Sequence, residues 1–207
     1  MRIRFFFLVL LLAGGAHAAP TILVFGDSLS AAYGIPRESG WVNLLARRLE
    51  NHKPAFRVVN ASVSGETTAG GLTRLPEVLA AHRPILTILA LGANDGLRGL
   101  PPPHTRRNLE TMIGLARKQG SQTLLLGMRM PPNYGTAYTR KFQSVFVETA
   151  EAQRVRLVPF LLEGVAEHQA MFQADGLHPD ARAQPILLDN VWRELVPMLA
   201  GLGSKAR

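Results

Sequence analysis

Five short apolar runs recur along the chain, separated by longer segments whose apolar positions repeat with the period of an α-helix. The runs predict strands at Thr21–Phe25, Phe56–Asn60, Ile85–Leu91, Gln122–Met128 and Val155–Phe160. The longer segments predict helices at about Gly40–Glu50, Thr67–Ala81, His104–Gln119, Thr136–Ala152 and Ala181–Ala200. This alternation is typical of right-handed βαβ units, so we expect an α/β fold with a central parallel sheet of about five strands and helices on both faces.

Prolines mark several boundaries in this pattern. We expect Pro101–Pro103 to lie in the loop after the third strand and Pro131-Pro132 in the loop after the fourth. Pro197 is expected to end or kink the last helix, because proline cannot donate the helical hydrogen bond. The segment Gly201–Arg207 is expected to fray.

The first eighteen residues have the pattern of a secretory signal peptide. Arg2 and Arg4 precede an apolar run, Phe5–Ala13, and Ala16-His17-Ala18 supplies an A-x-A cleavage signature. A membrane anchor is the alternative, but the apolar run ends at Gly14-Gly15 and falls short of the ~20 residues that span a bilayer. We therefore expect a signal peptide at 1–18, one domain at 19–207, and a mature protein that is periplasmic or secreted.

Composition narrows the possible chemistry. The chain has 207 residues and no cysteine, which excludes disulfides, zinc–thiolate sites and thiol catalysis. Its net charge is +8, and removal of the predicted signal leaves 21 basic and 15 acidic side chains, or +6. The basic residues are scattered with little aromatic interleaving, which argues against nucleic-acid binding. Transient attraction to anionic membrane lipid fits this charge better, although charge alone does not establish it.

The first strand ends in Gly26-Asp27-Ser28, where doubly wound sheets place reacting groups. A serine at this point exposes its hydroxyl, and its N–H would lie in a helix-start dipole, so it can attack a carbonyl and help to hold the oxyanion. The alternative is that Asp27 and Ser28 only cap the next helix.

Two later loops contain candidate oxyanion donors. Gly65 comes just before a predicted helix, where a bare backbone N–H can approach a ligand, and Asn94 carries an amide that can donate. The alternative for Gly65 is an ordinary turn glycine, with Thr67 as the helix cap. The alternative for Asn94 is a turn in which Asn and Asp bond to the local backbone.

Asp175 and His178, three residues apart near the end of the chain, have the spacing of an acid–base pair. The carboxylate can accept from imidazole Nδ1 while Nε2 faces outward, which is what a base needs to take a serine proton. The pair could equally form a turn or half of a metal site. No H-E-x-x-H motif and no other histidine at ligand spacing accompanies it, so we expect no metal and no cofactor.

Together these four motifs, in this order, resemble the GDSL-type serine esterases, or SGNH hydrolases. The matching blocks are Gly26–Leu29, Gly65, Gly92–Asp95 and Asp175–Pro179, and the resemblance covers nearly all of the mature chain. Three runs, Asn60–Glu66, Asn94–Gly99 and Pro132–Gly135, are similar to the periplasmic subgroup of multifunctional acyl-CoA thioesterases, lysophospholipases and arylesterases. One departure is Ala93, where this subgroup often has glycine, which makes substrate preference less transferable than chemistry.

The resemblance implies a flavodoxin-like three-layer α/β/α sandwich and a serine esterase that acts on esters and thioesters of fatty acyl chains. It implies Ser28, Asp175 and His178 as catalytic residues, with Ser28, Gly65 and Asn94 forming the oxyanion hole. The acyl chain would run past Leu97–Leu100 and Met130–Tyr134. Candidate substrate-binding residues are Leu97, Arg98, Leu100, Pro131 and Tyr134, with Arg98 meeting a headgroup.

Two other functions remain open. A carbohydrate O-acetyl esterase would use the same constellation with a shorter, more polar pocket, against which the leucines and prolines of the loops argue. The other is a non-catalytic envelope protein that binds lipid or glycan. The complete set of motif residues argues against this function. Asp27 and Asp95 are expected to hold the loops.

Overall fold

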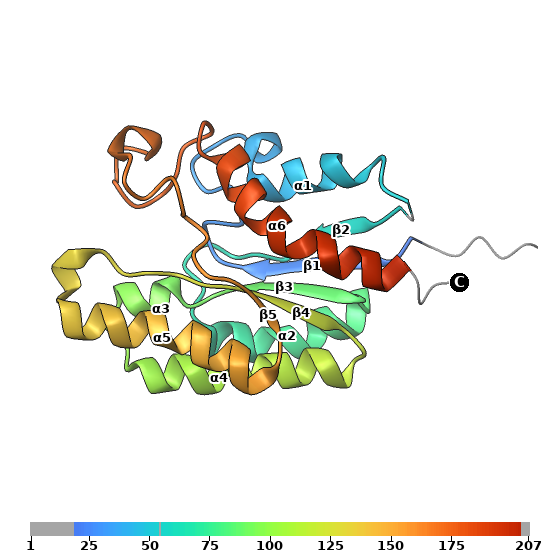
Figure 1. The fold of residues 1–207 in the computed structure, drawn as a ribbon, viewed down its shortest axis with the longest axis horizontal. Helices are drawn as coiled ribbons and strands as arrows, with labels where there is room; N and C mark the ends of the chain where they lie inside the picture. The colour runs from blue at the N-terminus through green and yellow to red at the C-terminus, as the bar shows by residue number, and fades with distance from the viewer. Residues whose placement is uncertain (1–18, 54, 204–207) are drawn as a thin grey trace, which may run out of the picture.

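The central layer of the fold is a parallel sheet of five strands in the order β2-β1-β3-β4-β5 (Figure 1). The strands are β1 (Thr21–Gly26), β2 (Arg57–Asn60), β3 (Leu86–Ala90), β4 (Gln122–Leu126) and β5 (Arg156–Val158). The computed structural model describes residues 19–53 and 55–203. The predicted signal peptide, residues 1–18, and the last residues, 204–207, lie outside this range, so the proposed cleavage stays a prediction.

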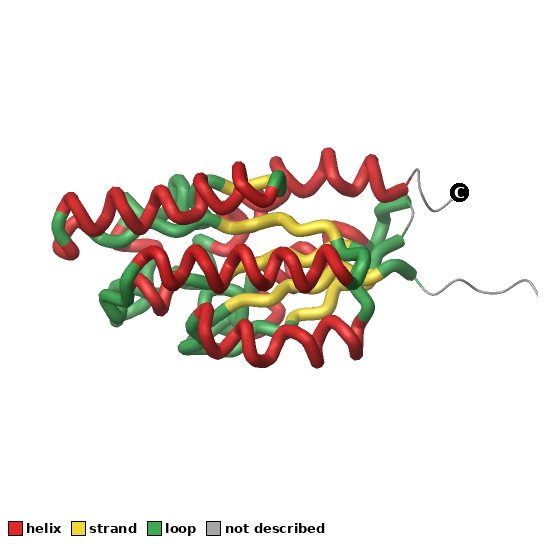
Figure 2. The backbone as a smooth tube through the Cα atoms, turned by 90° about the horizontal axis from the view of Figure 1, so that it is seen from below, coloured by secondary structure: helices red, strands yellow, loops and turns green. Residues whose placement is uncertain are grey.

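Helices cover both faces of the sheet, which confirms the predicted three-layer sandwich. One layer contains α1 (Trp41–Leu49) and α6 (Gln184–Gly203), which pack against each other. The other contains α2 (Thr68–His82), α4 (Pro102–Lys118) and α5 (Thr136–Gln153), seen side by side in Figure 2. Short elements complete the chain: α3 (Ala93–Leu97), η1 (Arg37–Ser39), η2 (Pro132–Tyr134) and η3 (Gln169–Met171). In the part of the chain that the structure describes, no helix is long and apolar enough to cross a membrane.

Strand β1 lies inside the sheet, between β2 and β3, and all six of its residues are buried. Such continuous burial explains why its sequence is apolar throughout instead of alternating. Val24 pairs with Asn60 of β2, and Phe25 pairs with Leu89 of β3. This register brings the carboxyl ends of three strands together, so the three loops that follow them start at one edge.

The prediction that Pro101–Pro103 lie in a loop is wrong for Pro102, which begins α4 because the first helical position needs no N–H donor. Pro197 lies inside α6, which continues to Gly203, so this proline does not end the helix. Pro197 is exposed, whereas Met198 and Leu199 are buried in the core, and this packing holds the helix together beyond the proline.

Candidate active site

Ser28, His178 and Asp175 form a continuous chain of hydrogen bonds at the carboxyl edge of the sheet. The Nε2 atom of His178 lies 2.9 Å from Oγ of Ser28, and its Nδ1 atom lies 2.6 Å from Oδ2 of Asp175. This is the arrangement expected from the sequence, with the carboxylate fixing one ring nitrogen and the serine hydroxyl at the other. It allows the imidazole to take a proton from Ser28 while Asp175 stabilises the resulting cation.

Asp175 is held in its ionised form by its own loop. Its Oδ1 atom accepts hydrogen bonds from the backbone N–H of Leu177, at 2.9 Å, and of His178, at 3.0 Å. These bonds, with the backbone N–H of His178 contributing most and the imidazole less, lower the pKa of Asp175 from 3.8 to about 2. The Asp175 carboxylate therefore stays charged near neutral pH.

The His178 loop is braced against the Ser28 turn. The ring of Tyr33 lies over the His178 imidazole, with centroids 4.6 Å apart. Gln173 donates to the carbonyl oxygens of Tyr33, at 2.8 Å, and of Pro179, at 3.3 Å. Sequence reasoning missed Tyr33 and Gln173, because neither belongs to a motif.

Ser28 lies on a turn, and the expectation that a helix begins there is wrong. The N–H groups of Ser30 and Ala31 both bond to the carbonyl oxygen of Asp27, but the next α-helix begins only at Trp41. Gly26 permits this turn, because a Cβ there would lie 2.9 Å from the carbonyl oxygen of Ala90 on β3. Ser28 therefore has no helix dipole of its own.

Two side chains hold this turn from outside. Asn60 at the end of β2 donates to the Ser30 carbonyl at 2.7 Å. The indole of Trp41 donates to the Leu29 carbonyl at 3.1 Å, and Trp41 itself is fully buried. The turn that carries Ser28 is thus anchored to both β2 and α1.

Gly65 and Asn94 come from the two loops in which the sequence placed them. Gly65 has a φ of +79°, a left-handed conformation that favours glycine, and a Cβ built there would meet no atom within 4 Å. Asn94 lies on α3 and lines the same cleft as Ser28 and His178. Thr67 caps α2 by accepting a hydrogen bond from Gly70 N, as expected. Gly65 lies two residues before this cap and takes no part in it.

Ala93 fits the third block without strain. The residue with a positive φ in this block is Gly92, at +121°. Ala93 is the first residue of α3 and has helical backbone. The methyl group of Ala93 is therefore accommodated on ordinary helical backbone, at the wall of the cleft.

The two motif aspartates are buried and bonded to the loops, as expected. Asp95 accepts from the backbone N–H of Thr68 at 2.8 Å and from its hydroxyl at 2.5 Å, which joins α3 to α2. Asp27 is 2% exposed, and burial raises its pKa from 3.8 to about 7. Hydrogen bonding from Leu29 partly offsets this rise, whereas the charges of Asp95 and Glu66 add to it.

A cleft of about 670 Å³ opens beside Ser28 and His178. Of the five predicted substrate-binding residues, Leu97 and Pro131 line it. The other three have contacts within the loops. The Arg98 guanidinium donates to the Gly65 carbonyl, the Tyr134 hydroxyl donates to the Leu97 carbonyl, and the Leu100 carbonyl accepts from Tyr138.

Most of the apolar wall of the cleft was not anticipated from the sequence. It comes largely from the loops after β4 and β5 and from the His178 loop. These residues are Met128, Phe160, Leu162, Phe172 and Leu177, whereas Met130 belongs to the segment expected from the sequence. Arg129, Glu167 and Gln169 add polar groups to the same cleft. Apolar lining with a few polar groups suits a substrate that carries an acyl chain.

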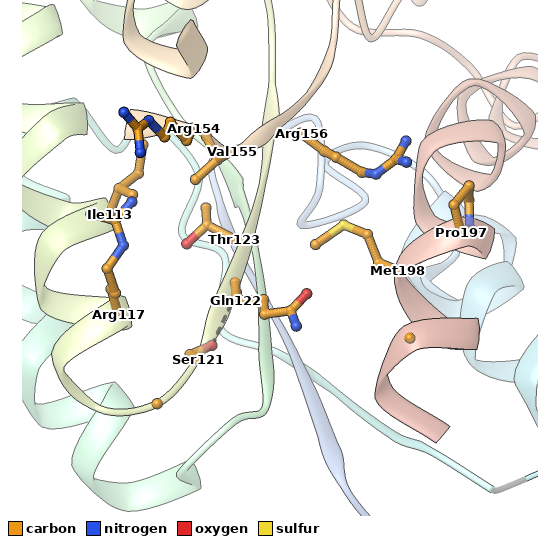
Figure 3. Close-up of a pocket in the computed structure, with 12 residues that line it drawn as sticks. Ile113, Arg117, Ser121, Gln122, Thr123, Arg154, Val155, Arg156, Pro197 and Met198 are labelled. Carbon is orange, nitrogen blue, oxygen red and sulfur yellow. Dashed lines mark hydrogen bonds between the residues drawn. The ribbon is translucent and has the colours of Figure 1, made fainter. Parts of the chain in front are cut away.

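A second hollow of about 460 Å³ lies at the amino ends of β4 and β5, away from the Ser28 motif (Figure 3). Three arginines line it, and the local structure accounts for the position of each. Arg117 is in the last turn of α4 and Arg154 caps α5, where helix dipoles favour cations, while Arg156 pairs with Glu194 at 3.0 Å. Among residues 19–53 and 55–203, no group of three His, Asp or Glu side chains could hold a metal ion.

A parallel α/β sheet with a Ser–His–Asp chain and an apolar cleft at its carboxyl edge is the architecture of a hydrolase of acyl substrates. The model of the GDSL-like Lipase/Acylhydrolase family matches residues 24–184, and the chain belongs to this family. It is an ester hydrolase.

Named relatives support this assignment. The chain is 50% identical over 192 residues to "Esterase TesA" of Pseudomonas aeruginosa, covering 93% of this chain and 96% of the relative. It is 38% identical over 195 residues to "Thioesterase 1/protease 1/lysophospholipase L1" of Escherichia coli, covering 94% and 92%. A crystal structure of TesA superposes with a TM-score of 0.84 at 51% identity, covering 86% of this chain and 98% of that one.

Proposed function

We propose that the protein hydrolyses carboxylic esters and thioesters of fatty acyl chains through an acyl-enzyme on Ser28. The observation that carries this proposal is the position of His178, whose two ring nitrogens bridge the Ser28 hydroxyl and the Asp175 carboxylate. A serine hydroxyl needs such a base, because it is a weak nucleophile at neutral pH.

In the first half of the reaction, the Ser28 Oγ–H bond breaks as its proton moves to His178 Nε2 and Oγ bonds to the substrate carbonyl carbon. The resulting oxyanion accepts from the N–H groups of Ser28 and Gly65 and from the Asn94 amide. His178 then gives its proton to the leaving alcohol or thiol as the tetrahedral intermediate collapses to the acyl-enzyme.

In the second half, water attacks the acyl carbon while His178 takes a proton from it. Collapse of this intermediate returns the proton to Ser28 Oγ and releases the carboxylic acid. No step needs a metal or cofactor, because the imidazole carries each proton and the donors of the oxyanion hole carry the developing charge.

The apolar cleft supports an acyl substrate over an acetylated sugar. Phe160, Leu162 and Phe172 line it beside the motif residues, and a short acetyl group would leave most of this surface without a partner. The E. coli relative carries thioesterase and lysophospholipase in its name, which supports thioesters and lipid esters as substrate classes.

Hydrolysis of p-nitrophenyl esters from acetyl to palmitoyl tests this function. We expect an optimum at medium or long chains that disappears in Ser28→Ala, with a loss on the order of a millionfold in kcat. Ser144→Ala, which removes an exposed hydroxyl on α5, is the matched control and should leave the rate unchanged. Activity confined to acetyl would favour the carbohydrate esterase, and undiminished activity of Ser28→Ala would exclude the mechanism.

We further propose that the protein acts outside the cytoplasm after removal of residues 1–18, on lipids it contacts transiently. N-terminal sequencing of the protein recovered from the cell envelope should begin at Ala19. Recovery of the intact N-terminus from the cytoplasm would contradict this location.

A further inference from the structure

The amide of Asn94 is flanked by two hydrogen-bond acceptors. Its Nδ2 atom lies 3.0 Å from the carbonyl oxygen of Glu66 and 3.4 Å from Oδ2 of Asp27. A carbonyl oxygen and a carboxylate oxygen can only accept, whereas the two ends of an amide differ: NH2 donates and oxygen accepts. An Asn94 side chain rotated by 180° would place its oxygen against both acceptors, so these neighbours determine which end occupies this position.

Asp27 is fixed tightly enough to set that orientation. Its Oδ1 atom accepts from the backbone N–H of Leu29 at 3.1 Å, which leaves Oδ2 directed toward Asn94. Its side chain is buried, and the neighbouring Gly26 is held close against β3. With one oxygen engaged and the side chain enclosed, the ionised Asp27 presents an acceptor to the Asn94 amide.

We propose that Asp27 is a positioning residue, which keeps the Asn94 NH2 group oriented as a donor to the oxyanion formed at Ser28. The inference rests on the proposed function, because it assigns Asp27 to the oxyanion hole of that same reaction. The Asn94 NH2 group has two hydrogens, and Glu66 holds one at a normal distance. The contact with Asp27 is longer, so the second hydrogen is weakly held and is available to an oxyanion.

The ionised carboxylate is the stronger acceptor for both partners, because each oxygen then carries negative charge. Protonation removes this charge and adds an O–H donor, which weakens the acceptor that faces the Asn94 NH2. Other ionisable groups surround this contact: Glu66, which pairs with Arg74, Asp95 on α3, and His178 across Ser28. The negative charges of Glu66 and Asp95 oppose ionisation of Asp27.

Asp27→Asn tests the orientation because it keeps the size of the side chain and changes one acceptor into a donor. With its oxygen on the Leu29 N–H, the new amide points NH2 at Asn94, and Asn94 must rotate or lose this partner. We expect kcat to fall about 10²–10³-fold, the cost of one oxyanion donor. KM should change little, because the donor acts in the transition state.

The decisive measurement is a double-mutant cycle with Asn94→Ala. If Asp27 acts through Asn94, Asp27→Asn should add nothing to the loss already caused by Asn94→Ala. Multiplicative losses would overturn the inference, because they would show that Asp27 acts independently, for example through the Ser28 turn. Full activity of Asp27→Asn in the wild-type background would overturn it as well. Asp189→Asn, on the surface of α6, is the matched control.

The proposed function fails by a different result. If Asn94→Ala or Ser28→Ala retained full activity, the oxyanion hole or the nucleophile would be wrong, whatever Asp27 does. If both lose activity and Asp27→Asn does not, only the positioning role is wrong.

A measurement on the unmodified protein keeps the inference testable if Asp27→Asn does not fold. The Asn94 side-chain amide resonances should shift with pH at the same midpoint as the Asp27 carboxyl carbon. An Asn94 midpoint that differed from that of the Asp27 carboxyl carbon, or no shift at all, would contradict the coupling.

Discussion

Arg98 and Gly65 are joined by a hydrogen bond of 3.0 Å from the Arg98 guanidinium to the Gly65 carbonyl oxygen. The bond connects the end of α3 to the loop after β2, which are two of the three segments that supply the candidate oxyanion donors. Gly65 itself has a left-handed backbone and no side chain to fix it. Arg98 therefore holds the peptide that follows Gly65, directly next to the peptide that carries the proposed N–H donor.

This contact gives Arg98 a role that differs from the headgroup recognition expected from the sequence. We predict that Arg98→Ala lowers kcat on a neutral p-nitrophenyl ester about tenfold, which is the low end of the value of a hydrogen bond to a charged group because this bond is exposed. The kcat of Arg98→Lys should lie between those of wild type and Arg98→Ala, because an ammonium can reach the carbonyl but lacks the planar guanidinium. Rates on anionic and neutral substrates distinguish the two roles of Arg98. An equal loss on both substrates would indicate that Arg98 holds the Gly65 loop. A loss confined to anionic substrates would indicate that Arg98 recognises a headgroup.

Asp175→Asn should lower kcat on the order of 10⁴-fold, because an amide can favour the wrong imidazole tautomer. The pKa of Asp175 is lowered to about 2, so its ionisation does not shape the activity profile near neutral pH. Its contribution to stability is present above the unfolded pKa of about 4 and is lost as pH falls toward 2.

Asp180→Asn is the matched control for that prediction. Asp180 lies two residues beyond His178 and has its own partner, Arg182, so it should remain within a few-fold of wild type. Steady-state rates from pH 5 to 9 measure both variants. Equal rates for Asp175→Asn and wild type would show that the 2.6 Å contact with His178 is not used in catalysis.

The sequence was sufficient, for a physical reason, to predict the order of elements and the contacts that join Ser28, His178 and Asp175. Parallel strands that are buried on both faces must be apolar throughout, so their ends are visible, and motif residues at strand ends converge on one edge. Ser28 and Asn94 were found in this way. Their hydrogen bonds to His178 and Glu66 then followed from tertiary packing.

The cleft wall could not be predicted in the same way. Phe160 and Leu162 follow β5, and Phe172 lies in the irregular chain before α6, where no periodicity distinguishes an inward from an outward side chain. The ring contact of Tyr33 with His178 joins residues far apart in the chain. The turn at Ser28 was mistaken for a helix start because both patterns use Asp and Ser.

Leu177 gives a test of the acyl groove. It lines the cleft beside His178, yet 45% of its surface is exposed, so an acyl chain can cover it without displacing core contacts. We predict that Leu177→Ala lowers kcat/KM about tenfold on decanoyl esters, within the ~1.5–3 kcal/mol available from burying a leucine, and leaves acetyl esters nearly unchanged. Val196→Ala, at a similarly exposed position on α6, is the control. An equal loss on both esters would place the acyl chain elsewhere.

The raised pKa of Asp27 predicts that its ionisation costs stability. A carboxyl with a pKa of about 7 when folded and 3.8 when unfolded binds more protons in the folded state between these values. Stability therefore falls as pH rises from about 4 to about 7, by a few kcal/mol at most, and stays lower above that range. Yet the ionised form is the stronger acceptor for both Leu29 and Asn94, so function and stability favour opposite charge states.

Asp27→Asn should remove this dependence, because its amide does not titrate. The Tm of Asp27→Asn minus that of wild type is therefore expected to become more positive between pH 5 and pH 8, even as kcat falls. The other ionisable groups are the same in both proteins, so their contributions to the pH dependence largely cancel in the difference. A Tm difference that stayed constant with pH would mean that Asp27 is ionised at pH 5 already. The hydrogen bonds from Leu29 and Asn94, at 3.1 and 3.4 Å, would then stabilise the buried carboxylate more strongly than their lengths indicate.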